Sequence, residues 1–148
     1  MSLDSLIRRP IDVLVVDDSD DAVVLTREAF ASGEGLRIAH VAGDGLEALR
    51  FLRREPPYES ARRPGLILLD LNMPRLDGLE TLRTLKRDPA LRHIPVIVLT
   101  VSDQPSDIRT AYAEGAAGYV RKPDDFEAFA AVARELQDYW TLVCRLPA

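Results

Sequence analysis

Residues 66–70 read LILLD, an uninterrupted apolar run that ends at an aspartate. A continuous run of this length, rather than an alternating one, is typical of a strand covered on both faces of a sheet. Further strand patterns, some of them weaker, occur at residues 11–16, 36–41, 95–100 and 118–120. The sequence therefore predicts five strands in a sheet that is covered on both faces.

Segments with the apolar spacing of helices separate these strands. They span residues 19–31, 45–53, 77–86, 106–114 and 126–143. Ser19 or Asp20 is the candidate N-cap of the first helix. Regular alternation of strand and helix indicates a parallel sheet with right-handed crossovers. We expect the α/β class, with a doubly wound, five-stranded parallel sheet in the order 2-1-3-4-5.

Composition limits the classes of function that fit the chain. Its 148 residues suit a single domain, with a core at about 11–143 and a short extension at 144–148. The net charge of −5 argues against a nucleic-acid partner. No apolar run approaches the ~20 residues of a membrane helix, and the N-terminus lacks the apolar core of a signal peptide. With a single cysteine, Cys144, the composition fits a cytoplasmic location.

Polar residues occupy the C-terminal ends of the predicted strands. They are Asp17 and Asp18 after the first strand, Asp70 and Thr100 at the third and fourth, and Lys122 after the fifth. In open parallel α/β sheets, sites form at the C-terminal ends of the strands. Because the order 2-1-3-4-5 makes strands 1, 3, 4 and 5 neighbours, we expect these side chains to converge.

Three carboxylates in one partly desolvated pocket repel one another unless a cation lies between them. Mg²⁺ prefers oxygen ligands, keeps several waters and often shares its shell with a phosphate. We expect Asp18 and Asp70 to bind it directly and Asp17 to bind it directly or through water. The backbone carbonyl of Asn72 is the candidate for a further ligand.

The same arrangement makes Asp70 a candidate nucleophile toward phosphorus, which would give an acyl phosphate. Lys122 and the cation would neutralise charge on the phosphoryl oxygens, and Thr100 would donate a hydrogen bond to one of them. Pro123 follows Lys122, and a cis bond there would hold the lysine backbone in a tight turn. The sequence leaves the isomer of that bond open.

The motifs VVDDSDD, LILLDLNMPRLDG, VIVLT and GYVRKP together resemble the receiver domain of two-component response regulators, over nearly the full length of the chain. The resemblance implies a flavodoxin-like receiver fold and a phosphorylatable signalling protein. It implies that Asp70 is the phosphoacceptor and that Asp17 and Asp18 are the metal-binding acid pair. It also implies that Thr100 is the switch hydroxyl and Lys122 the phosphate-pairing lysine.

Two further residues take their significance from this resemblance. Tyr119 corresponds to the switch aromatic, which in the family rotates inward as the threonine moves toward the phosphoryl group. A half-buried aromatic of an edge strand, packed on the neighbouring helix, is the alternative for Tyr119. Val101 stands where the family usually has a small side chain. Because a β-branched residue is stiff, we expect Val101 to restrict access of small phosphodonors to Asp70.

A narrower resemblance concerns the subtype. The proline-rich loop at residues 56–64, the stretches LKRDPALRHIPVIVLTVSD and DIRTAY, and the ending DYWTLVCRLP are similar to single-domain regulators that partner bacterial phytochrome histidine kinases. We expect no output domain after the last helix. The expected partner is therefore a sensor histidine kinase, with a bacteriophytochrome as the candidate.

The last predicted helix carries two apolar stripes. The first is expected to pack on the sheet and comprises Phe126, Phe129, Ala133, Leu136, Trp140 and Val143. The second comprises Val132, Tyr139, Leu142 and Leu146. A second apolar face favours a partner surface, and we expect a homodimer through it. A broad core face followed by an ordinary tail is the alternative.

Three functions fit the predicted pocket. The favoured one is a phosphorylated signalling module that is not an enzyme. The second is a Mg²⁺-dependent aspartyl-phosphate phosphohydrolase, but such enzymes usually place a second acid two residues after the nucleophile, where this chain has Asn72. The third is a non-phosphorylated interaction module, against which the combined presence of Asp70, Thr100 and Lys122 argues. The sequence does not name the kinase, the signal, the target or the lifetime of the phosphorylated state.

Overall fold

The computed structural model describes residues 10–31 and 33–147. Five parallel strands form one sheet in the order β2-β1-β3-β4-β5, which confirms the predicted order. Their bounds are β1 (Ile11–Val16), β2 (Leu36–Ala42), β3 (Leu66–Leu69), β4 (Val96–Thr100) and β5 (Gly118–Arg121). The helices are α2 (Asp20–Phe30), α3 (Gly45–Leu52), α4 (Gly78–Arg87), α5 (Pro105–Ala113), α6 (Phe126–Asp138) and the π-helical turn η1 (Tyr139–Val143).

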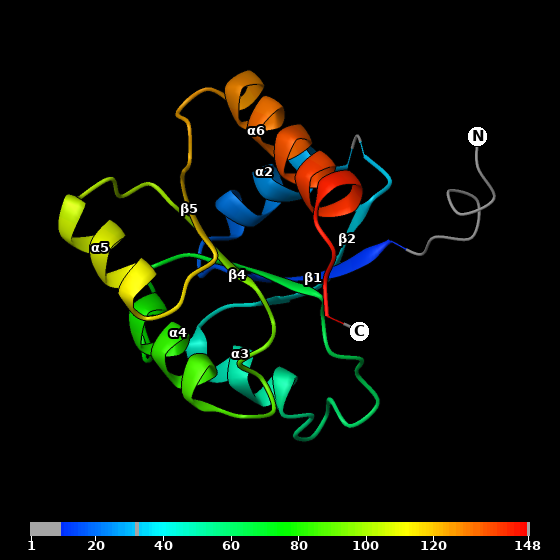
Figure 1. Ribbon diagram of the computed structural model, residues 1–148, viewed down its shortest axis with the longest axis vertical. Coiled ribbons are helices and arrows are strands. Elements are labelled where there is room, and N and C mark those ends of the chain that lie inside the picture. The colour runs from blue at the N-terminus through cyan, green and yellow to red at the C-terminus, as the bar shows by residue number, and fades with distance from the viewer. Residues whose placement is uncertain (1–9, 32, 148) are drawn as a thin grey trace.

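Helices cover both faces of the sheet, as the continuous apolar strands predict (Figure 1). On one face α2 and α6 pack together through Ala29, Phe30, Phe129 and Ala133. On the other face α3, α4 and α5 contribute Leu52, Leu82, Leu85 and Ala111. Strand residues alternate between these two cores, so that Val13 and Val15 point to one layer while Leu14 and Val16 point to the other.

The register of the sheet aligns the strand ends that carry polar residues. Val16 of β1 pairs with Leu69 of β3, so the residues that follow each of them leave the sheet side by side. Thr100 at the end of β4 pairs with Arg121 of β5. The C-terminal ends of four neighbouring strands therefore open onto one edge of the sheet.

Local sequence signals set where most helices begin. Ser19 caps α2, as predicted, by accepting a hydrogen bond from the Ala22 N–H. Asp44, Asp77 and Asp125 cap α3, α4 and α6 in the same way. Each of these oxygens satisfies a backbone N–H that has no partner within its own helix.

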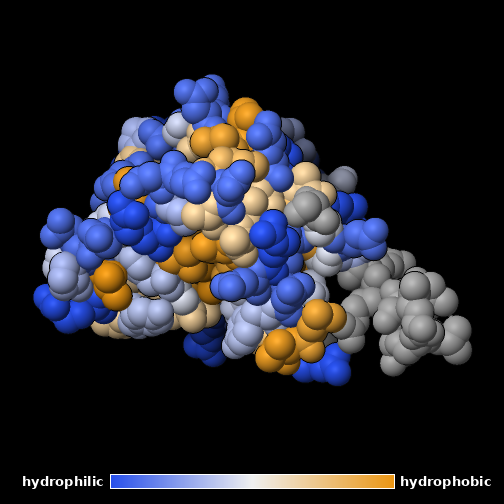
Figure 2. Space-filling view, turned by 90° about the horizontal axis from the view of Figure 1, so that it is seen from above, coloured by the Kyte–Doolittle hydropathy of each residue, from blue (hydrophilic) through white to orange (hydrophobic). Residues whose placement is uncertain are grey.

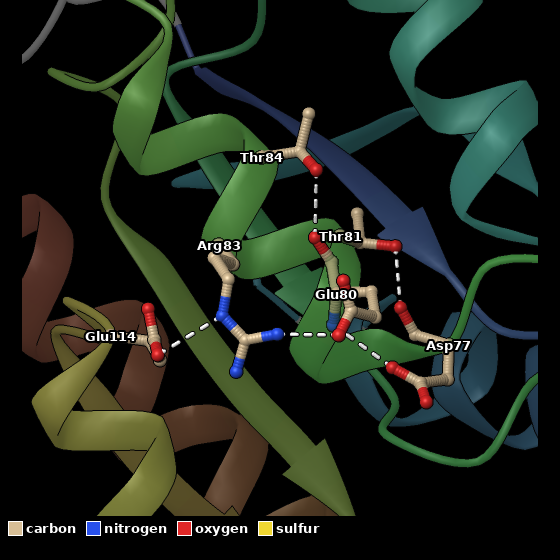
Figure 3. A network of polar contacts seen from close by, with 6 residues as sticks. All are labelled: Asp77, Glu80, Thr81, Arg83, Thr84 and Glu114. Carbon is tan, nitrogen blue, oxygen red and sulfur yellow. Dashed lines mark hydrogen bonds and ion pairs between the residues drawn. The ribbon is translucent and has the colours of Figure 1, made fainter.

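A network of polar contacts joins α4 to the end of α5 (Figure 3). Arg83 of α4 donates to Glu114, which follows the last residue of α5, at 3.0 Å. It also pairs with Glu80 one turn earlier on α4. In addition, the Thr84 hydroxyl donates to the Glu80 carbonyl of the same helix, and the Thr81 hydroxyl donates to the carbonyl of the N-cap Asp77. The two helices on this face are thus linked by charge as well as by apolar packing.

The end of the last helix differs from the prediction. The stripe expected to pack on the sheet includes Val143, but Val143 is 71% exposed, and Cys144 packs against the core instead. The cause is the π-helical turn, in which the Cys144 N–H donates to the Tyr139 carbonyl five residues earlier. This wider turn contains an extra residue, so the inward position moves from residue 143 to residue 144.

Within residues 10–31 and 33–147, no helix is both long enough and apolar enough to cross a membrane.

Candidate functional site

The three aspartates predicted to form an acidic site lie together at the C-terminal edge of the sheet. Asp17 and Asp18 follow β1, and Asp70 follows β3. One carboxylate oxygen from each lies within 4.8 Å of the other two. Asp17 is buried, Asp70 is half-buried and Asp18 is exposed, so the cluster opens to solvent on one side.

Lys122 supplies the positive charge that stabilises the most buried acid. Its Nζ donates to Asp17 Oδ2 at 2.7 Å, and both side chains are largely buried. The other carboxylate oxygen of Asp17 accepts from the Ser19 N–H at 3.0 Å. The Lys122 N–H donates to the Thr100 carbonyl, which fastens the lysine to the end of β4. Lys122 therefore bonds to Asp17, while its charge also acts on Asp70.

The surroundings of Asp70 act on its pKa in opposite directions. Burial raises the pKa of its carboxyl above the ordinary value, and the negative charge of Asp17 adds to the shift. The Thr100 hydroxyl and Lys122 act in the opposite direction. Thr100 Oγ1 is fully buried and, among the described residues, has no hydrogen-bond partner of ordinary geometry. A buried hydroxyl facing this carboxylate is suited to donate to a group attached there.

The donor set fits a divalent cation. The single ammonium of Lys122 does not balance three carboxylates, and carboxylate oxygens are the ligands that Mg²⁺ and Mn²⁺ prefer. Asp17, Asp18 and Asp70 would hold the ion, with water completing its shell. Asn72 is exposed in the loop directly after β3, and its carbonyl stays a predicted ligand.

Tyr119 of β5 is half-buried and packs against the core that α3, α4 and α5 share. Its hydroxyl donates to the Ser102 carbonyl at 2.8 Å, two residues beyond Thr100. Burial raises the pKa of this phenol. Tyr119 is thus a half-buried aromatic residue that is hydrogen-bonded to the segment after Thr100. Its role as the switch aromatic stays a prediction. Sequence reasoning missed Ser102, because a backbone carbonyl leaves no signal in residue type.

Gly78 shapes the loop after Asp70, as its place at the start of α4 suggests. A Cβ at this position would lie 2.3 Å from the Asp70 carbonyl oxygen and 2.5 Å from Leu71 Cα. The Gly78 N–H donates to the Leu71 carbonyl at 2.9 Å. Glycine is therefore required for the close approach of α4 to the backbone that follows β3.

The remaining predicted residues are placed as follows. Among the described residues the cis peptide is Pro56–Pro57, so the Lys122–Pro123 bond is trans. Val101 is 60% exposed immediately after Thr100.

The predicted dimer face is only partly exposed. Tyr139 and Leu142 are exposed, and Val132 is half-buried. Leu146 instead packs against the α2–α6 core, so its assignment to the outer face was wrong. The chain leaves the helix at Cys144 in an extended conformation, which turns Leu146 back toward the sheet.

Comparisons with known proteins agree with this geometry. The response regulator receiver domain matches residues 13–134. Response regulator Rcp1 of Synechocystis sp. is 34% identical over 136 residues, 92% of each chain. The phosphorylated cyanobacterial phytochrome response regulator RcpA has a TM-score of 0.88 at 34% identity, covering 94% of this chain and 99% of its own. The Mn²⁺-bound form of Rcp1 has a TM-score of 0.83 at 34% identity, covering 94% and 100%. The chain belongs to the response regulator receiver domain family.

Proposed function

We propose that this protein is a stand-alone response regulator that accepts a phosphoryl group on Asp70 from a phosphohistidine of a sensor histidine kinase. The observation that carries this proposal is the convergence of Asp17, Asp18 and Asp70 with Lys122 and Thr100 at one edge of the sheet. The combination provides a nucleophile, a cation site and two groups that bind phosphoryl oxygens.

The chemistry uses each residue in a separate role. A carboxylate oxygen of Asp70 forms a bond to phosphorus as the bond between phosphorus and the donor nitrogen breaks, and the electron pair of that bond leaves with the donor imidazole. Lys122 lies where its charge stabilises the phosphoryl oxygens. A divalent cation, when bound, supplies further positive charge to those oxygens. The Thr100 hydroxyl donates to the phosphoryl group once it is attached.

Relatives support a link to light signalling. RcpA, which this chain matches over nearly its whole length, is a phytochrome response regulator whose structure was solved in the phosphorylated form. Rcp1 was solved with Mn²⁺ bound. The phosphodonor proposed for this chain is therefore a phytochrome histidine kinase, and the proposed cation is Mg²⁺.

A homodimer through the end of the last helix is part of the proposal. Tyr139, Leu142 and Val143 are 49%, 74% and 71% exposed within the single π-helical turn η1. Figure 2 shows the side of the molecule that carries α2 and α6, where apolar side chains gather between hydrophilic ones. Exposed apolar side chains in such numbers favour an interface with a second copy.

Light scattering tests the dimer. The double variant Tyr139→Asp/Leu142→Asp should have the mass of a monomer, because two charges would be buried without partners. Tyr112→Asp is the matched control, since Tyr112 of α5 is 51% exposed away from this face. An unchanged dimer in the double variant would exclude the face.

Phosphorylation assays separate the proposed function from its two alternatives. Incubation with Mg²⁺ and a cognate kinase or acetyl phosphate should give a labelled protein, and Asp70→Asn should abolish the label. Turnover of many equivalents of small phosphate esters would instead indicate a phosphohydrolase, which Asn72 in the place of a general acid argues against. Absence of label with every donor would indicate a non-phosphorylated interaction module.

A further inference from the structure

The loop between β3 and α4 is fastened at its tip to the start of α3. Arg75 in this loop donates through Nε to Asp44 Oδ2 at 2.7 Å, and its Nη2 contacts the same oxygen. One residue later, the Leu76 carbonyl accepts from the Gly45 N–H at 3.2 Å. The loop that begins directly after the proposed phosphoacceptor is thus tied to a different helix by two adjacent contacts.

Asp44 is built into the fold more firmly than an ordinary surface acid. It is 7% exposed, and its second oxygen caps α3 by accepting from the Glu47 N–H at 2.9 Å. Burial alone would raise the pKa of its carboxyl, but this hydrogen bond and the Arg75 guanidinium outweigh burial and lower the pKa. The acid therefore stays ionised and offers a fixed, charged anchor to the loop.

Arg75 adopts a backbone conformation that L-residues rarely occupy. Its φ is +62°, in the left-handed region. This conformation is unfavourable for a residue that carries a Cβ, and it persists where the surrounding structure determines it. The contact with Asp44 supplies that determination. Without the contact, we expect the backbone at Arg75 to relax to a negative φ and the loop to shift.

We propose that the Arg75–Asp44 ion pair is a latch that positions the β3–α4 loop for cation binding. Asn72, whose carbonyl is the predicted ligand, lies three residues before Arg75, and Gly78 fixes the other end of the loop against Asp70. Arg75 and Asp44 are positioning residues: they act through the loop and do not touch the ion. The inference rests on the proposed function, and it adds that the Arg75–Asp44 pair controls the affinity of the acidic site for its cation.

Mn²⁺ affinity of the full chain, measured by isothermal titration calorimetry, tests the latch. Arg75→Gly removes the guanidinium while tolerating the positive φ, and Asp44→Asn removes the charge while keeping a side-chain oxygen for the helix cap. Each variant should weaken Mn²⁺ binding about tenfold, the lower end of what loss of an outer-shell partner costs. The double variant should be no weaker than either single variant, because both break the same contact.

A second aspartate–arginine pair in the same protein provides the matched control. Arg37 donates to Asp12 at 2.9 Å at the opposite edge of the sheet. Asp12→Asn and Arg37→Gln should leave Mn²⁺ affinity unchanged. Wild-type affinity in Arg75→Gly and Asp44→Asn, or equal weakening in all four variants, would overturn the latch while leaving the proposed function intact. A wild-type chain that binds no Mn²⁺ would overturn both.

Discussion

Aspartates lie at both edges of the sheet, but their charges are balanced in different ways. Near the N-terminal ends of the strands, Asp12 of β1 accepts from Arg37 and lies 3.7 Å from Arg62. At the C-terminal ends, Asp17, Asp18 and Asp70 lie together, and Lys122 forms an ion pair with Asp17. The chain neutralises the first edge by itself and leaves an excess of negative charge at the second. That excess marks the edge that receives a ligand from outside.

Removing a ligand at the C-terminal edge should have the largest effect. Asp18→Asn should weaken Mn²⁺ binding by at least the roughly 10–100-fold that loss of an outer-shell partner costs, because it removes a predicted direct ligand. Asp12→Asn, the same chemical change at the other edge, should leave the dissociation constant unchanged. Calorimetric titration of both variants makes the comparison, and equal effects would erase the distinction between the edges.

The same substitution should change stability in opposite directions at the two edges. In metal-free buffer at pH 7, Asp70→Asn should raise the free energy of unfolding, because burial raises the pKa of Asp70 and the ionised group destabilises the folded state. This gain should disappear as pH falls below the ordinary value of 3.8, where both states are protonated. Asp12→Asn should lower stability by about 0.5 kcal/mol through loss of a partly exposed ion pair. Urea unfolding at pH 7 and pH 3 measures both, and a loss of stability in Asp70→Asn would contradict the comparison.

The unbalanced edge also includes a hydroxyl. Thr100→Val replaces the buried Oγ1, which has no hydrogen-bond partner of ordinary geometry among the described residues, with a methyl group of similar shape. At pH 3, where Asp70 is protonated and the hydroxyl no longer stabilises its charge, the variant should raise the free energy of unfolding by about 1 kcal/mol. The variant should still accept a phosphoryl group on Asp70 but lose the conformational change in which Thr100 moves toward that group. Urea unfolding gives the stability. Destabilisation by a similar amount would show that the hydroxyl already has a partner in the unphosphorylated protein.

Access to the C-terminal edge should produce the smallest effect. Val101 is predicted to slow small phosphodonors, and its side chain is 60% exposed beside the end of β4. Val101→Ala should therefore modestly increase the initial rate of labelling by acetyl phosphate. Labelling by a kinase, which brings its own docking surface, should change less. Equal acetyl phosphate rates in the two proteins would remove Val101 from the description of the site.

The order of strands and the convergence of the site were predictable, because both depend on patterns that residue type carries. Continuous apolar runs such as residues 66–69 identify doubly covered strands, and the parallel topology brings their C-terminal ends together. The end of the last helix was not predictable in the same way. Helical periodicity assumes a constant number of residues per turn, and the π-helical turn at Tyr139–Val143 exposes Val143 and turns Cys144 inward.

Contacts between loops and distant elements near the site also could not be predicted from the sequence. Tyr119 donates to the carbonyl of Ser102, and Arg75, whose own φ is positive, donates to Asp44. Neither contact follows a fixed spacing, since each joins a loop to a distant element. The residues of the acidic cluster were therefore recognisable from the sequence, whereas the contacts made by Ser102, Arg75 and Asp44 were not.

The central claim is that the unbalanced edge accepts a phosphoryl group on Asp70. Wild-type protein is incubated with Mg²⁺ and acetyl phosphate, reduced with borohydride, which converts an acyl phosphate into an alcohol, and mapped by tandem mass spectrometry. Reduction should occur at position 70 and be absent without Mg²⁺, while Asp12 stays unmodified. Reduction at another carboxylate, or an unmodified protein with an intact cation site, would contradict the claim.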